Sequence, residues 1–465
     1  MSDRLVQALT AELGPSGWIP GDGAQKWSRD WLDKYGVEPL GVARPKTTQE
    51  VSRIVGKCTA AGIKIVPQGG NTGLVGGSVA QAPGQIILSM ERMKKIGDYV
   101  DTSGTIEVEA GVVLAVLHSR LSETDHIFPM HLGSEGSAQI GGLIATNAGG
   151  SHAFRFGMMQ DLVLGLEVVL PDGSVFDGMR AVQKDNSGYQ LRKQFCGSEG
   201  TLGIVTRAVL KLEPSPKQTV TSLLVLKSHQ AAMELARRLK SQIGEFLTAM
   251  EFFSDSGVAL ALKNIPEFSF PLETRSSCSM LVEAQACSSR TPLPDILEEV
   301  LEDELSKERV LDGAIASSLQ QALDFWRLRE EQPEGQKREG PQLKHDISIP
   351  PARLAEYLDC AEEICSAILP GIRIDPFGHL GDGNVHFNLS PPLGASGFTG
   401  KDEELGREIY RIAVEMGGSY AAEHGIGRSK FELSKELRSS VENRLLNCLK
   451  LVFDQENQLN PGVLT

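Results

Sequence analysis

Two histidines, His379 and His386, lie seven residues apart in the segment GHLGDGNVHFN, which spans positions 378–388. Within it, Asp382-Gly383 between apolar-rich flanks is a strong signal for a two-residue β-hairpin turn. With that turn, His379 lies opposite His386, and directly opposed residues share one sheet face with Cβ atoms about 4.5–5.5 Å apart. Two imidazoles at this separation can bind one divalent metal ion. Asn388, two residues beyond His386, projects from the same face.

A catalytic zinc site needs a third protein ligand and an open coordination position. Glu423, in the segment AEHGIG, is the candidate for that ligand, and Gly425 permits a tight bend close to it. The alternative interpretation is a stacked cross-strand pair of histidines without a metal ion, because the residues match no common zinc motif. The residues alone leave both interpretations open.

Two glycine-rich segments could hold a different ligand. Residues 67–78, PQGGNTGLVGGS, and residues 133–150, GSEGSAQIGGLIATNAGG, contain no lysine or arginine. Consecutive backbone N–H groups can hold a pyrophosphate without cationic side chains, and glycine permits the positive φ values and the close approach that this needs. Two such loops facing each other would form a diphosphate cradle. Each loop alone is also consistent with an ordinary turn, and neither matches a P-loop or a Rossmann fingerprint.

The composition limits the kinds of partner. The 465 residues carry a net charge of -14, which argues against nucleic acid or an anionic membrane surface as the main partner. The seven cysteines are scattered without a CxxC pair, as expected of buried thiols in a reducing compartment. No stretch reaches the length of a membrane span, and the N-terminus lacks signal-peptide or transit-peptide character. We therefore predict a cytoplasmic protein.

The glycine-rich segments must be positioned by regular elements. A capping box at residues 47–50 predicts a helix that stops near Gly62, and a strand at 63–66 then leads into the first glycine-rich loop. Further strands are expected at 86–90 and 106–109. Another pair should flank the turn at 171–173.

A second domain is expected after residues 212–216, LEPSP, where two prolines mark a boundary. Strands and helices alternate beyond it, which predicts an α+β domain. The polar stretches at 331–341 and 391–400 are expected to be exposed loops. The last helix is expected at 433–453.

Four segments together resemble a known family. In order along residues 38–216, PQGGNTGLVGGS, HLGSEGSAQIGGLIATNAGG, GLEVVLPDGSVF and CGSEGTLGIVT are similar to the FAD domain of the vanillyl-alcohol oxidase/p-cresol methylhydroxylase (VAO/PCMH) superfamily. The resemblance implies an α+β, two-domain flavoprotein with an FAD-binding domain at 1–216. A substrate domain with an antiparallel sheet would cover 217–420, and residues 421–465 would return to the FAD domain.

The resemblance also implies which residues hold FAD. Covalently flavinylated members often have a histidine in the first loop, whereas this chain has Asn71, so we expect non-covalent FAD; His131 is the alternative site for a covalent link. The implied cofactor residues are Pro67, Gly69, Gly70, Asn71, Thr72, Gly73, Gly77 and Ser78 in the first loop, Ser134, Gly136, Ser137, Gly141, Gly142, Thr146, Asn147 and Gly150 in the second, and Glu199, Gly200, Gly203, Ile204 and Asn460 around them.

The C-terminal half resembles the FAD-linked oxidase part of the D-2-hydroxyglutarate and D-lactate dehydrogenase group, on the segments GHLGDGNVHFN and AEHGIG. This similarity covers the chain from about residue 38. It implies that His379, His386 and Glu423 bind a divalent metal ion, expected to be zinc. Asn388 and His424 would then face the substrate.

The chemistry of such a site is the oxidation of a D-2-hydroxy acid. The substrate could chelate the metal through its hydroxyl and one carboxylate oxygen, which lowers the pKa of the hydroxyl. His424 could accept the proton as general base while the Cα hydride passes to flavin N5. The alternatives for His424 are that it is itself a metal ligand, or that it only donates a hydrogen bond to a residue that binds the metal. Electrons would leave to an external acceptor, for which electron-transfer flavoprotein is the family-based expectation.

Arg329 and Lys344 bear on the substrate. In type and spacing they resemble the clamp that binds the distal carboxylate in D-2-hydroxyglutarate dehydrogenases, although surface ion pairs are the alternative interpretation. Four residues after the arginine the family carries a threonine, and here Pro333 stands instead. The pocket is therefore expected to accept D-2-hydroxyglutarate or a related diacid such as D-malate.

Four other functions remain open. The first two are a D-lactate or glycolate enzyme of the same superfamily and an oxidase that reduces oxygen. The others are a flavin- or metal-binding module without catalysis and a zinc hydrolase. The residues do not determine the oligomeric state, for which a homodimer is one option.

Overall fold

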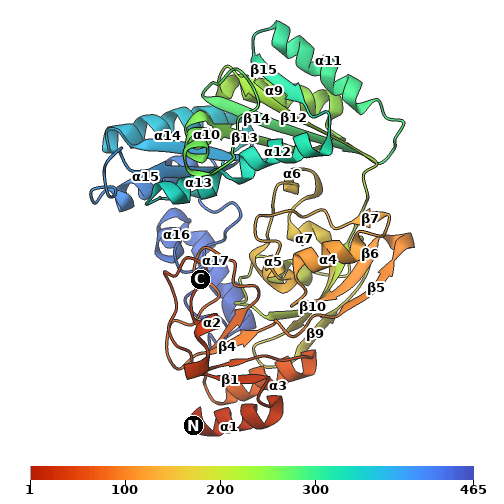
Figure 1. Cartoon of the computed structure of the whole chain (residues 1–465). Coiled ribbons are helices and arrows are strands. Elements are labelled where there is room, and N and C mark those ends of the chain that lie inside the picture. The colour runs from red at the N-terminus through yellow and green to blue at the C-terminus, as the bar shows by residue number, and fades with distance from the viewer. Residues whose placement is uncertain (1, 465) are drawn as a thin grey trace. The chain divides into compact units, whose positions relative to one another are not determined.

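The computed structural model describes residues 2–464, which form two compact units (Figure 1). The first unit contains the chain up to Gly150, Phe156–Ser215 and the chain from Glu423 onward. The second contains Pro216–Ala422 together with the short segment Ser151–Arg155. The glycine-rich loops therefore belong to the first unit and the histidine hairpin to the second.

The first unit is built on three sheets. Its four-stranded sheet has the order β1-β2-β4-β3, and its five-stranded sheet has the order β5-β6-β10-β8-β9. The strands are β1 (Trp18–Pro20), β2 (Gly41–Ala43), β3 (Ile65–Gln68), β4 (Ile86–Ser89), β5 (Ile96–Val100), β6 (Thr105–Glu109), β8 (Val163–Val169), β9 (Val175–Gly178) and β10 (Ile204–Lys211), with a small pair formed by β7 (His126–Ile127) and β11 (Glu213–Pro214).

Helices cover these sheets and share one apolar core with them. Core residues from the four-stranded sheet, such as Ile65 and Ile86, cluster with Val108 and Leu166 from the five-stranded sheet. The helices are α1 (Ser2–Leu13), α2 (Gln25–Ser28), α3 (Thr48–Ala60), α4 (Leu114–Leu121), α5 (Ile140–Thr146), α7 (Met159–Leu162), α8 (Leu191–Phe195), α16 (Phe431–Leu437) and α17 (Ser440–Phe453).

Helix α3 shows how local sequence produces these elements. The Thr47 side chain accepts a hydrogen bond from the Glu50 N–H at 3.2 Å, and the Glu50 carboxylate accepts one from the Lys46 N–H at 2.7 Å. The first bond satisfies one of the N–H groups that a helix start leaves without partners, and the second fixes the residue just before the N-cap. The apolar face of α3 is buried in the core, as its periodicity predicts. The helix predicted after Thr47 is thus confirmed, and β3 leads from it into the first glycine-rich loop.

The second unit is a seven-stranded antiparallel sheet with helices on both faces. Its strand order is β15-β12-β14-β13-β17-β18-β16. The strands are β12 (Gln218–Leu226), β13 (Leu247–Ser254), β14 (Cys278–Ala286), β15 (Val310–Ile315), β16 (Asp346–Ser348), β17 (Arg373–His379) and β18 (Asn384–Ser390), and the helices are α6 (Ala153–Phe156, in part), α9 (His229–Ile243), α10 (Asp255–Asn264), α11 (Leu293–Ser306), α12 (Leu319–Glu330), α13 (Gln332–Glu339), α14 (Leu354–Ile368) and α15 (Asp402–Glu415).

The two faces of this sheet carry different helices. Phe253 and Phe377 form an apolar cluster with Phe325 and Leu328 of α12. On the opposite face, rings of α14 and α15 contact the sheet, for example Tyr357 against Phe387 with ring centroids 6.0 Å apart. Because successive side chains of a strand point to opposite faces, every second residue of β13, β17 and β18 faces α12.

Two sequence-based expectations for helices were wrong. The expected loop at 331–341 contains helix α13, with Gln332 and Gln336 fully buried. Pro333 occupies its first turn, where the missing N–H removes no helical hydrogen bond. Gly335 lets α13 approach α10 closely, since a Cβ there would lie 2.7 Å from the Ala261 Cα. Polar composition misled the prediction because the buried face of α13 is made of glutamines and glycine.

The expected last helix at 433–453 is interrupted. Ser439 is extended and starts α17 with a capping box, in which the Ser439 Oγ accepts the Glu442 N–H and the Glu442 carboxylate accepts the Ser439 N–H. The S-x-x-E pattern for this start is present in the sequence.

None of the helices in residues 2–464 has the length and apolar character needed to cross a membrane.

The C-terminal segment completes the first unit. The buried Lys450 donates to the carbonyls of Thr201 and Leu459 and to the Asp454 carboxylate, at 2.6–2.9 Å. Asp454 in turn accepts the backbone N–H groups of Gln458 and Leu459. Burial lowers the pKa of Lys450, and the Asp454 carboxylate opposes this effect.

We expect Lys450→Met to destabilise the first unit by about 3 kcal/mol, because it leaves the Asp454 carboxylate buried without its cation. Urea unfolding followed by tryptophan fluorescence measures the change. The control is Lys401→Met, which removes an exposed pair with Glu404 and should change stability by less than about 0.5 kcal/mol. Equal stability of the two variants would contradict the assigned role of Lys450.

Candidate active site

The histidine hairpin is present, with a register that differs from the expected one. His379 pairs with Asn384, and His386 pairs with Phe377, because the turn has four residues, Leu380–Gly383. The expected direct pairing of the two histidines was therefore wrong by two residues. A shift of two keeps every side chain on its original face, so His379 and His386 still share one face as diagonal neighbours. Their ring centroids are 5.9 Å apart.

The neighbouring strands bring further polar residues to this face. Glu251 of β13 lies directly opposite His379, and Asp346 of β16 lies directly opposite His386. The ladder of β16 and β18 extends to a bridge between Leu343 and Leu389 in the same register. That register places Lys344 opposite Asn388, on the same face as the two histidines.

Each histidine has a carboxylate on the Nδ1 side of its ring. The Glu251 Oε1 lies 2.6 Å from the His379 Nδ1, within a hydrogen bond. The Asp346 Oδ1 lies 3.9 Å from the His386 Nδ1, which is the range of an ion pair. A carboxylate hydrogen-bonded to Nδ1, as Glu251 is to His379, orients the imidazole so that Nε2 can bind a metal ion.

Arg329 reaches the same carboxylate from helix α12. Its Nε donates to the Glu251 Oε2 at 2.8 Å, and its guanidinium lies 4.6 Å from the centre of the Phe377 ring. Glu251, His379 and Arg329 are 1%, 6% and 9% exposed, so all three charged or polar groups are buried together. Burial alone would raise the pKa of Glu251, but the nearby His379 and Arg329 outweigh burial and lower it. Glu251 therefore contacts two residues singled out from the sequence, His379 and Arg329.

Helix α13 also contacts this face. The Asn388 Nδ2 donates to the Gln336 Oε1 at 2.8 Å, and the Gln336 Nε2 donates to the Asp375 carbonyl at 3.2 Å. Asn388 is thus fixed by a neutral side chain of α13, the helix whose first turn contains Pro333. Lys344, in contrast, is exposed.

In the first unit, the two glycine-rich loops lie against each other. A Cβ on Gly70 would be 2.1 Å from the Ser137 carbonyl oxygen, and one on Gly69 would be 3.3 Å from the Gly142 Cα. Side chains at these positions would push the loops apart, so glycine is required for the approach. At Gly73 and Gly136 a Cβ would meet no atom within 4 Å, so the backbone there borders open space.

Several side chains predicted to contact FAD also stabilise the loops themselves. Asn71, with φ 55°, donates to the Arg29 carbonyl and accepts from the Ser78 hydroxyl. Asn147 ends α5 in the left-handed conformation and accepts the Gln160 N–H at 2.9 Å. The loops can therefore present their backbone N–H groups while these side chains hold the conformation.

The segment that carries Glu423 and His424 is attached to the same loops. The Gly150 N–H donates to the Glu423 Oε1 at 3.0 Å. The Glu199 carboxylate accepts the N–H groups of Ile426 and Gly427, each at 2.8 Å, and burial raises its pKa. Glu199 therefore fixes the backbone just after His424.

Asn460 completes this arrangement by donating to the carbonyls of Gly77 and Glu199, each at 2.8 Å. His131, the alternative site for a flavin link, is exposed and groups with His118 and Glu135. The Nδ1 atoms of His131 and His118 lie 3.4 and 3.7 Å from the Glu135 Oε2. These three side chains, of which His118 comes from α4, form a separate group of metal-binding residue types.

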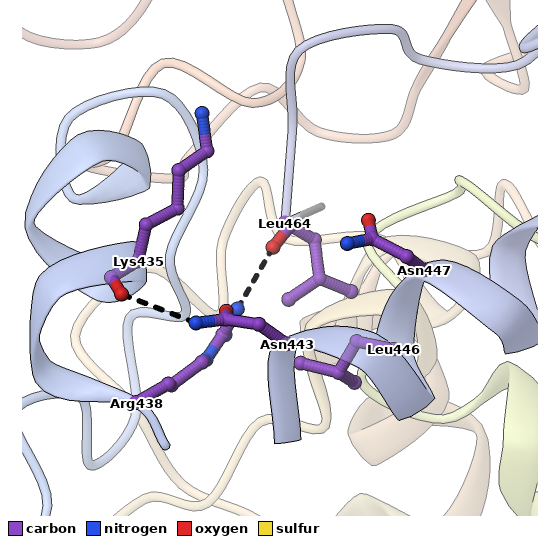
Figure 2. Close-up of a pocket in the computed structure, with 6 residues that line it drawn as sticks. All are labelled: Lys435, Arg438, Asn443, Leu446, Asn447 and Leu464. Atoms are coloured by element: carbon purple, nitrogen blue, oxygen red, sulfur yellow. Dashed lines mark hydrogen bonds between the residues drawn. The ribbon is translucent and has the colours of Figure 1, made fainter. Parts of the chain in front are cut away.

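A hollow between α16 and α17 is lined by none of the predicted residues (Figure 2). There the Asn443 Nδ2 donates to the Lys435 carbonyl, and the Arg438 Nη1 donates to the Leu464 carbonyl, each at 3.1 Å. The first bond joins the two helices, and the second holds Leu464 beside them. The hollow carries none of the chemistry predicted from the sequence.

The residues present fit both predicted cofactors. The first unit offers two closely apposed glycine-rich loops with positive φ values at Asn71 and Gly150, as a backbone cradle for a diphosphate requires. The second unit offers two imidazoles, each with a carboxylate near Nδ1, as a metal site requires.

Two protein families match the chain. Residues 39–178 match the family described as FAD binding domain, and residues 215–464 match FAD linked oxidases, C-terminal domain. The second match covers more than half of the chain. The chain belongs to the FAD-linked oxidase family.

Curated relatives of this FAD-linked oxidase agree with the assignment. It is 33% identical to the D-2-hydroxyglutarate–pyruvate transhydrogenase of Saccharomyces cerevisiae, over 94% of this chain and 88% of the relative. It is 35% identical to the mitochondrial D-2-hydroxyglutarate dehydrogenase of Rattus norvegicus, over 93% and 79%. A bacterial D-2-hydroxyglutarate dehydrogenase, from Xanthomonas citri, is 33% identical over 99% and 95%.

Solved structures show the same fold. p-Cresol methylhydroxylase with substrate bound superposes with a TM-score of 0.77 at 16% identity, over 99% of this chain and 96% of that chain. Alkyldihydroxyacetonephosphate synthase gives a TM-score of 0.75 at 17% identity, over 98% and 84%. The α+β, two-domain VAO/PCMH architecture with an antiparallel sheet is therefore confirmed. So is the prediction of an FAD-dependent enzyme from the hydroxy acid dehydrogenase branch of this superfamily.

The sequence interpretation missed three residues of the FAD-linked oxidase that contact candidate site residues: Glu251, Asp346 and Gln336. A signal exists for Glu251, which is a lone acidic residue in the otherwise apolar or neutral strand LTAMEFFS. Acidic residues are almost never fully buried unless they are paired. Its partners could not be named, because strand pairing across the sheet is not local in sequence.

We expect Gly70→Ala to weaken FAD binding by about 5–150-fold, because an added methyl group at a close approach costs about 1–3 kcal/mol. The ratio of flavin to protein after purification and dialysis measures the effect. Gly84→Ala is the control, since its Cβ would meet no atom within 4 Å. A Gly70→Ala protein with full flavin content would show that the loops need no such approach.

Proposed function

We propose that this FAD-linked oxidase oxidises a D-2-hydroxy diacid, D-2-hydroxyglutarate or a close relative such as D-malate, to the 2-oxo acid. The observation that supports this most is the polar sheet face of the second unit. It presents two histidines, each near a carboxylate, together with Asn388 and Lys344, and Arg329 contacts it from α12. The relatives named as D-2-hydroxyglutarate dehydrogenases support the substrate class.

FAD is proposed to bind non-covalently in the first unit. Gly69–Gly73 and the facing residues around Gly141 and Gly142 would hold its diphosphate through backbone N–H groups. Glu199, Gly200, Gly203, Ile204 and Asn460 are buried behind these loops and would support them. When bound, FAD supplies the two-electron acceptor for the hydrogen and electron pair that leave the substrate Cα.

His379 and His386 would hold a divalent metal ion, for which zinc is proposed, with Glu423 as the third ligand. The support for Glu423 is the resemblance of AEHGIG together with the need of such a site for a third protein ligand. When bound, the ion supplies Lewis acidity toward the oxygens of a 2-hydroxy acid.

The remaining steps fall to side chains of the chain. Arg329 and Lys344 would bind the distal carboxylate, the arginine through its two Nη groups, because Glu251 engages its Nε. Asn388 would orient the hydroxy acid end of the substrate. His424 would accept the hydroxyl proton on a ring nitrogen as the Cα hydrogen leaves.

Pro333 limits which groups can bind the distal carboxylate of the substrate. It lies in the first turn of α13, the helix that places Gln336 on Asn388, and it offers neither a hydroxyl nor an N–H to a carboxylate. The distal carboxylate would then depend on the two cations alone, which tolerates diacids of different length. A monoacid enzyme for D-lactate or glycolate is the alternative, and it would need no such cations.

The electron acceptor and the location are proposed on sequence grounds only. An external acceptor such as electron-transfer flavoprotein is proposed, and the transhydrogenase relative makes a 2-oxo acid an acceptor worth including in the same assays. The expectation of a cytoplasmic protein stays a prediction, since several relatives are named as mitochondrial.

Anaerobic mixing with a panel of hydroxy acids tests the proposed reaction. We expect the oxidised flavin absorbance to bleach with D-2-hydroxyglutarate and D-malate and to stay unchanged with the L enantiomers. Faster bleaching with D-lactate or glycolate than with every diacid would favour the alternative. Flavin that no hydroxy acid reduces would contradict the proposed function.

Lys344→Met tests the clamp. We expect the KM for a D-2-hydroxy diacid to rise by about tenfold or more, because a hydrogen bond to a charged group contributes about 1.5–3 kcal/mol. Steady-state kinetics on D-lactate should be unaffected, since a monoacid has no distal carboxylate. Lys401→Met, beside α15 on the opposite side of the sheet, is the matched control. A KM for every diacid that matches the unmutated protein would exclude Lys344 from the clamp.

A further inference from the structure

Glu251 is the residue in the second unit that touches two members of the proposed site at once. Its Oε1 contacts the His379 Nδ1 at 2.6 Å, and its Oε2 accepts from the Arg329 Nε at 2.8 Å. It is 1% exposed and lies at the centre of a strand whose residues are all buried. A carboxylate so deeply buried needs compensation, and these two residues provide it.

We propose that Glu251 is a positioning residue that couples the metal ligand His379 to the carboxylate-binding Arg329, so that metal retention and diacid recognition depend on one side chain. This inference rests on the proposed function and extends it. Glu251 itself touches neither the ion nor the substrate in this proposal. It acts through the two residues that do.

The effect on His379 follows from donor and acceptor chemistry. The Glu251 carboxylate accepts the Arg329 Nε–H through its Oε2, and a carboxylate paired with a guanidinium acts as an acceptor, so the His379 Nδ1 donates to its Oε1. A neutral imidazole with its hydrogen on Nδ1 has its lone pair on Nε2, which is the atom left to bind a metal ion. Glu251 thus fixes both the tautomer and the rotation of the ring.

The effect on Arg329 follows from the shape of the guanidinium. With Nε held by Glu251 and the guanidinium carbon 4.6 Å from the centre of the Phe377 ring, the rotation of the group is restricted. The two Nη groups then form the pair of donors that suits a carboxylate. Phe377 is two residues from His379 on the same face of β17, so one short stretch of sheet holds both ends of the arrangement.

A neighbouring glutamate shows what a structural role alone looks like. Glu283 of β14 is also buried, lies 3.5 Å from the Nε2 of the buried His152, and accepts from the Trp326 Nε1 at 2.8 Å. No contact joins it to His379 or Arg329 among the hydrogen bonds and ion pairs of the described residues. Glu283→Gln is therefore a matched control for the loss of a buried strand carboxylate beside a histidine.

The first measurement is zinc affinity of the FAD-loaded protein, by competition with a chromogenic chelator. We expect Glu251→Gln to bind Zn²⁺ about 10–100-fold more weakly than the unmutated protein, the usual effect of losing such a partner of a metal-bound histidine. Glu283→Gln should keep the original affinity. With zinc at saturation, Glu251→Gln should also raise the KM for the diacid more than the KM for D-lactate.

A second variant guards against misfolding, because Glu251→Gln leaves the Arg329 cation buried without a partner. The double variant Glu251→Gln/Arg329→Met removes both charges, a change that buried pairs often tolerate. It should retain flavin and fold, and still bind zinc about 10–100-fold more weakly. Either variant, once folded, with unchanged zinc affinity would overturn the coupling role.

The same experiment separates the inference from the function on which it rests. If the unmutated protein binds zinc and its flavin is reduced by a diacid while the Glu251 variants behave like Glu283→Gln, only the inference fails. If the unmutated protein binds no divalent ion, the metal site and the inference fail together. In that case flavin reduction by the hydroxy acid panel still decides the proposed activity.

Discussion

The candidate site depends on the pleat of one antiparallel ladder. Because successive residues of a strand point to opposite faces, four adjacent strands place Glu251, His379, His386 and Asp346 on the same side of the sheet. The other side of these strands is packed against α14 and α15 through aromatic rings. The backbone hydrogen bonds of the ladder therefore fix the positions of these four residues, so that their side chains lie close to one another.

Part of this site could be predicted from the sequence because the relevant signals are local. The hairpin around Asp382-Gly383 and the glycine-rich loops are such signals, and both elements are present. The register of the hairpin was not predictable from the turn alone. Gly383 has φ +87°, and a Cβ there would lie 1.9 Å from the Ile349 carbonyl oxygen, so packing against another segment accompanies the four-residue turn.

The residues that sequence reasoning missed are those whose role depends on distant neighbours. Glu251 and His379 are 128 positions apart, and only the pairing of β13 with β17 brings them together. Helix α13 was missed because its buried face is polar, with Gln336 satisfied by Asn388 and by a strand carbonyl. Periodicity of apolar residues carries no information about such a face.

The first unit is made of segments that lie far apart in the sequence, and this affects how the chain folds during its synthesis. Gln458 bonds to Ile63, 395 positions earlier, and the Ile426 and Gly427 N–H groups reach Glu199. The ribosome must therefore translate past residue 458 before all of these hydrogen bonds can form. Residues 216–422 are contiguous, so they can fold as a unit while the first unit is still incomplete. The early glycine-rich loops thus acquire part of their stabilising contacts only after the whole of this intervening domain has been translated.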